Sequence, residues 1–114
     1  MEKHTICKIR DTYQAIKEFE TKFEEAFNMS LNEAMLLCLL DEKGASTAGE
    51  AAEALCLTAS NTSKVIRLVE DKGLLKRSFD KTDRRKIIFC LTKKGETTLN
   101  SIKQKDIALP YILQ

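Results

Sequence analysis

Residues 47–73 read TAGEAAEALCLTASNTSKVIRLVEDKG, and this stretch predicts two helices separated by a tight turn. Thr47 and Glu50 have the spacing of a capping box, in which each side chain bonds a free backbone amide at the start of a helix. Thr58 can begin the second helix in the same way, and we expect that helix to end at Gly73. A short helix, a tight connection and a longer helix make a helix-turn-helix.

The second of these helices is predicted to have two different faces. One face has the spacing of a buried stripe and consists of Thr62, Val65, Ile66 and Val69. The opposite face carries short hydrogen-bonding side chains and then cations, namely Ser60, Asn61, Ser63, Lys64 and Arg67. The helix should therefore pack on one side and present polar groups on the other.

A β-hairpin is expected next. The segments LLKRSF (74–79) and KIIFCL (86–91) are β-prone, and the loop between them, DKTDRRK (80–86), contains two adjacent arginines. Thr92 can then cap a last helix, whose extent is limited by Pro110. The tail IALPYILQ (107–114) is apolar, so we expect it to need burial, on this chain or elsewhere.

Two further helices are predicted before the helix-turn-helix. Apolar residues recur at three- and four-residue steps over residues 6–27, which is typical of one long amphipathic helix. Its stripe must pack either on the rest of the chain or on a second copy, and the sequence leaves both open. Ser30 and Glu33 form another capping box, which starts a helix that we expect to run from Leu31 to Lys43.

The composition favours one globular domain. The chain has 114 residues, which suffices for one modest core but not for two independent ones. No segment approaches the roughly 18 consecutive apolar residues of a membrane helix, and the start MEKHTICKIRD is charged where a signal peptide would be apolar. We therefore expect a cytoplasmic protein that does not interact with a membrane.

The cysteines do not suggest a metal or a disulfide framework. Four widely spaced cysteines, without a CxxC pair, are typical of reduced and mostly buried thiols; they are Cys7, Cys38, Cys56 and Cys90. His4 is the only histidine, and the sequence contains no catalytic triad pattern, phosphate-binding glycine loop or HExxH motif. We expect no metal site, no cofactor, no catalytic residues and no enzymatic activity.

Charge is concentrated in one third of the chain. Residues 1–63 carry 6 Lys or Arg against 11 Asp or Glu, whereas residues 64–94 carry 11 against 4, a net charge of +7. Such a region is either a solvated face or an anion-binding surface, and charge alone does not separate the two.

The run GEAAEALCLTASNTSKVIRLVEDKGLLKRSFDKTDRRKIIFCLTKKG (49–95) closely resembles the DNA-binding core of MarR-type transcription regulators. The distinguishing features are the Asp83-Arg84-Arg85 wing and the Leu-Thr-Lys-Lys-Gly sequence at residues 91–95. The resemblance covers about residues 30–105. It implies a mainly α winged helix-turn-helix with a small β-wing: four helices, the hairpin and a fifth helix. Residues 1–114 would form a single winged-helix domain. Its DNA-binding core would be residues 30–92, and the helical segments 1–28 and 93–114 would serve dimerisation.

The resemblance also implies roles for individual residues. The helix near 58–72 would read the major groove, with base edges met by Ser60, Asn61, Ser63 and Lys64. Arg67 would hold a phosphate. The wing near 80–86 would enter the minor groove with its cations Lys81, Arg84 and Arg85. We favour Arg84 as the inserted tip and a pair between Asp83 and Arg85 that braces the loop, although the two arginines could exchange roles.

The expected partners follow from the same resemblance. They are double-stranded DNA with a palindromic operator, a second copy of the chain and a small-molecule effector, and the expected action is repression. Relatives usually continue through a further long C-terminal helix, so the dimer could instead form through the stripe of the first helix and the apolar tail. Some relatives respond to oxidation of a cysteine in the first helix. Cys7 is therefore either a redox site or a packed side chain. The alternative function is a winged-helix protein-interaction module that does not read DNA.

Overall fold

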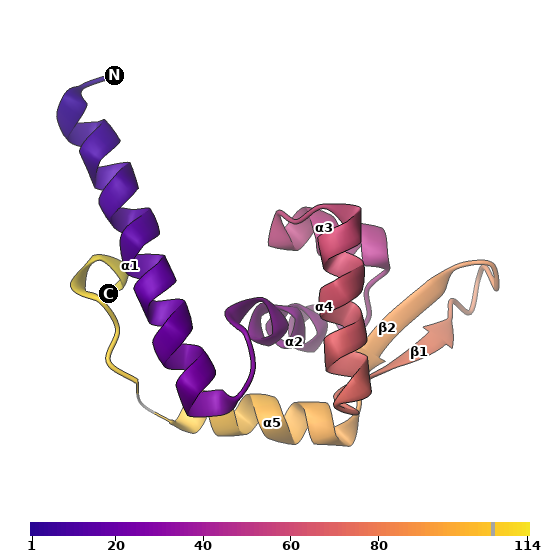
Figure 1. Ribbon diagram of the computed structural model, residues 1–114. Coiled ribbons are helices and arrows are strands. Elements are labelled where there is room, and N and C mark those ends of the chain that lie inside the picture. Colours follow the sequence, from indigo (N-terminus) through magenta and orange to yellow (C-terminus); the bar gives the residue numbers. More distant parts are fainter. Residues whose placement is uncertain (106) are drawn as a thin grey trace. The chain divides into compact units, whose positions relative to one another are not determined.

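The computed structural model describes residues 1–105 and 107–114, and it has the predicted winged helix-turn-helix architecture (Figure 1). The chain divides into two compact units, residues 32–104 and residues 1–31 with 105–114. Residue 106, within the segment 93–114 that we expected to support dimerisation, lies outside the described residues. No helix of the described residues is both long and apolar enough to cross a membrane.

The helix-turn-helix consists of α3 (Ala48–Leu55) and α4 (Ala59–Asp71). The predicted capping box is confirmed, because the Thr47 hydroxyl accepts a bond from the Glu50 amide and the Glu50 carboxylate accepts one from the Thr47 amide. The predicted Thr58 cap is confirmed by a bond of 3.1 Å from the Asn61 amide to Oγ1. Between the helices Cys56 takes a left-handed conformation, with a φ of 55°. Local hydrogen bonds therefore set both helix starts.

Helix α2 (Leu31–Lys43) supplies much of the core of the second unit. Its buried leucines are Leu36, Leu37, Leu39 and Leu40, and α4 adds the predicted buried face of Thr62, Val65, Ile66 and Val69. The buried carboxylate of Glu33 accepts a hydrogen bond of 3.0 Å from Lys72 Nζ, just beyond the end of α4. This ion pair joins two segments 39 residues apart in the sequence.

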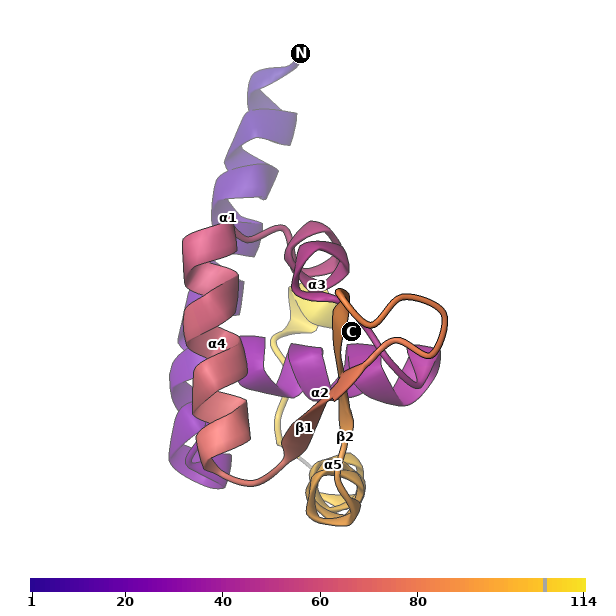
Figure 2. The same cartoon turned by 90° about the vertical axis from the view of Figure 1, so that its right-hand side faces the viewer.

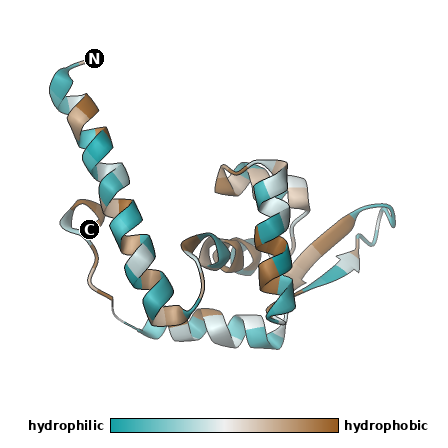
Figure 3. Ribbon diagram, in the orientation of Figure 1, coloured by the Kyte–Doolittle hydropathy of each residue, from teal (hydrophilic) through white to brown (hydrophobic). Residues whose placement is uncertain are grey.

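The wing is an antiparallel hairpin of β1 (Leu75–Phe79) and β2 (Ile87–Leu91), with the predicted loop 80–86 between the strands. Its register pairs Leu75 with Leu91 and Phe79 with Ile87. Ser46 adds an isolated bridge to Phe89 through two backbone hydrogen bonds, of 3.0 and 2.8 Å. The hairpin extends away from α3 and α4 (Figure 1), and Figure 2 looks onto it from the side of its loop. Strand β2 is apolar along its length (Figure 3).

The helix after the wing, α5 (Lys93–Gln104), begins where Thr92 was expected to cap it. Thr92 Oγ1 accepts a bond from the Gly95 amide and donates one to the carbonyl oxygen of Gly73, at 3.1 and 2.6 Å. Gly73 has a φ of 75°, which favours glycine at the end of α4. A hydrogen bond thus connects the start of α5 to the end of α4.

The other unit contains α1 (Lys3–Phe27) and the short 3-10 helix η1 (Tyr111–Leu113), which contacts it. Three phenylalanine rings lie next to one another along α1, in tilted pairs. The ring centroids are 6.1 Å apart for Phe19 and Phe23 and 4.7 Å apart for Phe23 and Phe27. Lys105 Nζ lies 5.4 Å from the centroid of the Phe27 ring. The apolar tail is not covered within the single chain for much of its length, because Leu109, Tyr111 and Ile112 are exposed there.

The expectation of mostly buried cysteines is wrong. All four are free thiols; Cys38 and Cys56 are exposed, and Cys7 and Cys90 are half-buried. An apolar run of sequence does not bury each of its members, because only some positions of a helix or strand face the core. On α2, partial burial and then the nearby Glu42 carboxylate raise the pKa of the Cys38 thiol.

Candidate nucleic-acid interface

The outward face of α4 displays the residues that the sequence singled out. Ser60, Asn61, Ser63, Lys64 and Arg67 are all exposed. The opposite face is held in the core by Val65, Ile66 and Val69, so the helix cannot rotate to hide its polar side. Thr58 fixes where the helix begins. The structure therefore presents one row of hydrogen-bonding groups and cations to solvent.

The wing loop is organised by two aspartates. Asp80 Oδ1 accepts hydrogen bonds from the backbone amide and the hydroxyl of Thr82, both at 3.1 Å. The bond from the amide and then that from the hydroxyl lower the pKa of Asp80. Backbone bonds of 3.0 Å run from Asp80 N to Lys86 O and from Lys86 N to Asp83 O. The loop is thus a hydrogen-bonded turn with a defined shape.

The two wing arginines occupy different surroundings. The expected contact between Asp83 and Arg85 is present, because Asp83 Oδ1 accepts bonds from Arg85 N at 3.0 Å and from Arg85 Nε at 3.3 Å. The Arg85 side chain nevertheless remains 93% exposed. Arg84 instead lines a surface hollow of about 560 Å³ together with Ser78, Phe79, Asp80 and Lys81. The wing therefore offers one guanidinium held by a carboxylate and a second arginine that lines a surface hollow.

An ion pair joins the wing to α4. Arg77 of β1 donates to both carboxylate oxygens of Glu70, at 2.8 and 3.1 Å, and its guanidinium lies 5.5 Å from the centroid of the Phe89 ring. The hydrogen bond from Arg77 is the main cause of a lowered pKa of Glu70. A groove of about 300 Å³ lies alongside, and its lining includes Ser63 and Arg67 of α4. The exposed face of α4 and the wing consequently form one continuous surface.

Arg77 was not predicted from the sequence as a residue of this surface, and neither was the exposed apolar pair of Phe79 and Ile87 beyond it. The alternation of the strand was a usable signal for Arg77, because it puts this cation on the same face as the apolar residue Leu75. A charge on that face needs a partner. The partner, Glu70, lies on another element, so its identity depended on the tertiary structure.

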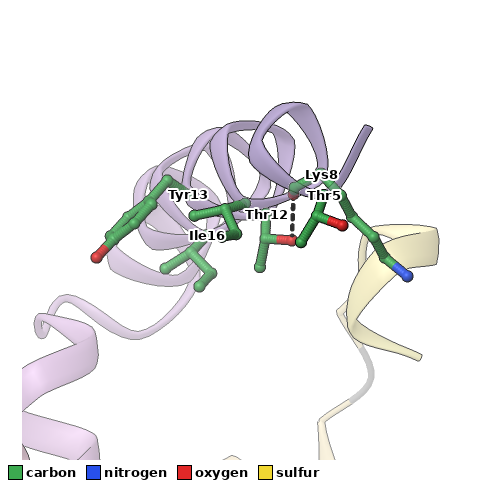
Figure 4. A pocket seen from close by; sticks show the side chains of 6 residues that line it. Thr5, Lys8, Thr12, Tyr13 and Ile16 are labelled. Carbon is green, nitrogen blue, oxygen red and sulfur yellow. Dashed lines mark hydrogen bonds between the residues drawn. The ribbon is translucent and has the colours of Figure 1, made fainter. Parts of the chain in front are cut away.

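In the other unit, α1 carries an apolar hollow of about 320 Å³ (Figure 4). Its lining comes from one side of the helix and consists of Thr5, Lys8, Ile9, Thr12, Tyr13 and Ile16. The Thr12 hydroxyl donates a bond of 2.8 Å to the Lys8 carbonyl oxygen and so bonds to its own helix. Ile9 and Tyr13 are exposed. This face is a candidate contact surface for another chain, and the half-buried Cys7 lies on the same helix.

No metal site is present in the part of the chain that the structure describes. Residues 1–105 and 107–114 contain no group of three or more His, Cys, Asp or Glu side chains that could hold a metal ion.

Comparison with known proteins relates this surface to a family. The model of the MarR family matches residues 29–87, which is just over half of the chain. The chain is also 28% identical over 78 residues to YfiV of Bacillus subtilis (strain 168), described as an uncharacterised HTH-type transcriptional regulator. That match covers 68% of this chain and 49% of YfiV, so the chain spans about half the length of this relative.

Solved structures share the fold. The transcriptional regulator BldR from Sulfolobus solfataricus superposes with a TM-score of 0.80 at 26% identity, covering 91% of this chain and 78% of BldR. BpsR from Bordetella bronchiseptica superposes with a TM-score of 0.72 at 22% identity, covering 82% of this chain and 69% of BpsR. The DNA binding of BpsR is regulated by 6-hydroxynicotinic acid. At that identity, the likeness to BpsR shows the fold alone.

Proposed function

Since the chain belongs to the MarR family, we propose that it is a sequence-specific DNA-binding transcription regulator that acts as a repressor. The family consists of DNA-binding regulators that are not enzymes, in agreement with the absence of enzymatic activity that we expected. In this proposal α4 reads the major groove and the wing enters the minor groove.

The main support for the proposal is that two exposed basic elements, α4 and the wing, form one surface. The polar row of α4 and the cations of the wing belong to the same unit, and the pair of Arg77 with Glu70 connects them. Residues 64–94, which contain most of this surface, carry a net charge of +7 from 11 basic and 4 acidic residues. A concentrated positive charge beside exposed hydrogen-bond donors suits a nucleic acid duplex.

On α4, base contacts are assigned to the residues nearest the start of the helix. Asn61 can make two hydrogen bonds to adenine, and Lys64 can donate to guanine. Ser60 and Ser63 can bond to either kind of base edge. Arg67, one turn further along, is assigned to a phosphate. All of these side chains are exposed, so they can make such contacts without rearrangement of the core.

On the wing, the cations Lys81, Arg84 and Arg85 are assigned to the minor groove of an A·T-rich segment. A narrow groove of that kind has a strong negative potential, which attracts guanidinium groups. Arg84 was the favoured tip, but Arg85 also has support, because Asp83 holds its Nε while leaving the side chain 93% exposed. A side chain that is already held loses less conformational freedom when it binds.

We assign dimerisation to the helical segments 1–28 and 93–114. The apolar side of α1 and the exposed tail would be covered by a second copy, which accounts for the exposure of Ile9, Tyr13 and Tyr111 in a single chain. A two-fold dimer would match a palindromic operator. A small-molecule effector, as for BpsR, and a cytoplasmic location complete the proposal.

Selection of bound duplexes from a random DNA library, at fixed salt, tests the proposal. An enriched palindrome with half-sites about one helical turn apart is expected. The variant with both Arg84→Ala and Arg85→Ala should lose that enrichment. Salt is kept constant because phosphate contacts alone give nonspecific affinity. No enriched sequence from folded protein would favour the alternative, a winged-helix module that binds another protein.

The single variants Arg84→Ala and Arg85→Ala separate the roles of the two arginines. The variant that removes the inserted residue should relax the A·T preference under the wing. The other should lower the affinity for all duplexes alike. Asp83→Asn weakens the ion pair with Arg85. It should relax the A·T preference as Arg85→Ala does only if Arg85 is the inserted residue.

Dimerisation is tested separately by Tyr13→Glu, which places a charge on the apolar side of α1. Sedimentation equilibrium should show a dimer for the natural chain and a monomer for the variant. Glu18→Gln, which changes charge on the same helix outside the lining of the hollow, is the control. A natural chain that is monomeric at all concentrations would contradict this assignment.

A further inference from the structure

The outer half of the wing exposes an apolar pair that the core does not use. Phe79 and Ile87 are direct cross-strand partners, and they are 63% and 44% exposed. Closer to the helices, the same face of the hairpin carries Leu75 and Phe89, which are buried. Residues opposite each other in an antiparallel pair of strands lie on the same face of the sheet. Every second residue along a strand also lies on that face. Apart from Arg77, which pairs with Glu70, this face of the hairpin is apolar, and it continues past the core into solvent.

This face is turned toward the exposed side of α4. Ile87 and Phe89 line the same groove of about 300 Å³ as Ser63 and Arg67 of α4. A duplex bound to both α4 and the wing would consequently pass over the apolar face of the hairpin and not behind it.

Phe79 also shares a surface hollow with two of the wing cations. It lines the hollow of about 560 Å³ that contains Lys81 and Arg84. Phe79 is the last residue of β1, so it stands at the base of the loop 80–86 and not at its tip. A side chain inserted between bases would have to come from the tip. A side chain at the base meets the rim of the groove, where deoxyribose rings present the apolar part of the DNA backbone.

We propose that Phe79, supported by Ile87, makes a nonpolar contact with deoxyribose rings at the rim of the groove that the wing tip enters. The inference rests on the proposed function and adds a residue to its binding surface. The contact excludes water from apolar surface without neutralising a phosphate. The contact therefore contributes a part of the DNA affinity that does not depend on salt concentration. It can form with double-stranded DNA of any sequence.

The test measures DNA affinity at several salt concentrations for Phe79→Ala, Phe79→Leu and a control, Met35→Ala. Met35 is exposed on α2, outside α4 and the wing. Fluorescence anisotropy would use a labelled mixed-sequence duplex and any duplex that the selection enriches. Phe79→Ala should bind roughly five- to twentyfold more weakly at every salt concentration, with an unchanged slope of log affinity against log salt. Phe79→Leu should recover most of the affinity, and Met35→Ala should match the natural chain.

Several outcomes would overturn the inference. One is an affinity of Phe79→Ala equal to that of the natural chain. Another is a salt slope reduced by about one, because the loss would then come from a displaced cation such as Arg84. A lower denaturant midpoint for Phe79→Ala would assign the loss to the folding of the wing, since an exposed ring should contribute little to stability. If the natural chain bound no duplex, the proposed function would fail together with the inference. If the natural chain bound DNA and the Phe79 variants bound it with the same affinity, the inference alone would fail.

Discussion

Arg77 and Glu70 form a bidentate ion pair, with Arg77 Nε 2.8 Å from one carboxylate oxygen and Arg77 Nη2 3.1 Å from the other. The pair connects the first strand of the wing to the last turn of α4. The planar guanidinium also lies over the Phe89 ring of the second strand. One arginine thus holds three elements, which makes it a positioning residue for the surface assigned to DNA.

Glu70→Gln should destabilise the protein slightly near neutral pH and not at all in acid. The Arg77 hydrogen bond lowers the pKa of folded Glu70 below its ordinary value of 4.5. A lowered folded pKa stabilises the protein above the unfolded pKa, and this contribution is lost as the pH falls through the folded pKa. Urea unfolding at about pH 7 and at a series of decreasing pH values, down to where the difference becomes constant, measures the difference between variant and natural chain. An equal difference at every pH would show that the pair does not act through the charge of Glu70.

Gly95→Ala and Gly49→Ala should change stability in opposite directions. A Cβ at Gly95 would collide with the carbonyl oxygen of Leu74, so the start of α5 would have to move, at a cost of about 1–3 kcal/mol or more. A Cβ at Gly49 meets only Thr47 Oγ1, at 4.0 Å. Alanine should therefore stabilise α3 by about 0.5–1 kcal/mol. Thermal unfolding of both variants checks the signs, and a stable Gly95→Ala would contradict the packing of α5 on Leu74.

Lys72→Met should cost more than Lys103→Met, although each removes one ion pair. Lys72 faces Glu33, which is only 3% exposed, whereas Lys103 and Asp41 are both about half exposed. Removing the cation from a buried carboxylate should cost about 1–3 kcal/mol. Loss of the exposed pair should stay within about 0.5 kcal/mol. Similar free energies of unfolding for both variants would argue against a structural role for the buried pair.

Thr47→Ala should destabilise the domain by about 1 kcal/mol, because it removes the acceptor for the Glu50 amide at the start of α3. The suitable control is Thr21→Ala on α1, where the hydroxyl bonds only to a carbonyl oxygen of its own helix. That change should be neutral or slightly stabilising, because alanine is the better helix former. Chemical denaturation measures both, and equal effects would show that the cap contributes nothing beyond helix propensity.

Features that depend on a few neighbouring residues were predicted well. The starts of α3 and α4, the glycine at the end of α4 and the loop 80–86 agree with the structure. Each of these is decided by hydrogen bonds or backbone preferences within about four residues. The exposed face of α4 was predicted for a similar reason, since helical periodicity separates its two sides.

The burial of individual side chains was predicted less well. The apolar stretches around the cysteines suggested buried thiols, but Cys38 and Cys56 point to solvent. The apolar tail is partly exposed, and so is much of the stripe of α1. Hydrophobicity along the sequence shows that a surface needs cover, but it does not show whether this chain or another one supplies it.

By itself the sequence determined the order of helices and strands, the two sides of α4 and the concentration of basic charge in residues 64–94. All three follow from residue type and local spacing. Only the tertiary structure decided that Arg77 pairs with Glu70, that Ser46 pairs with Phe89, and that Phe79 extends an apolar face beyond the core. These relationships join separate elements, so they depend on how the helices and the hairpin pack and not on the spacing of residues along the chain.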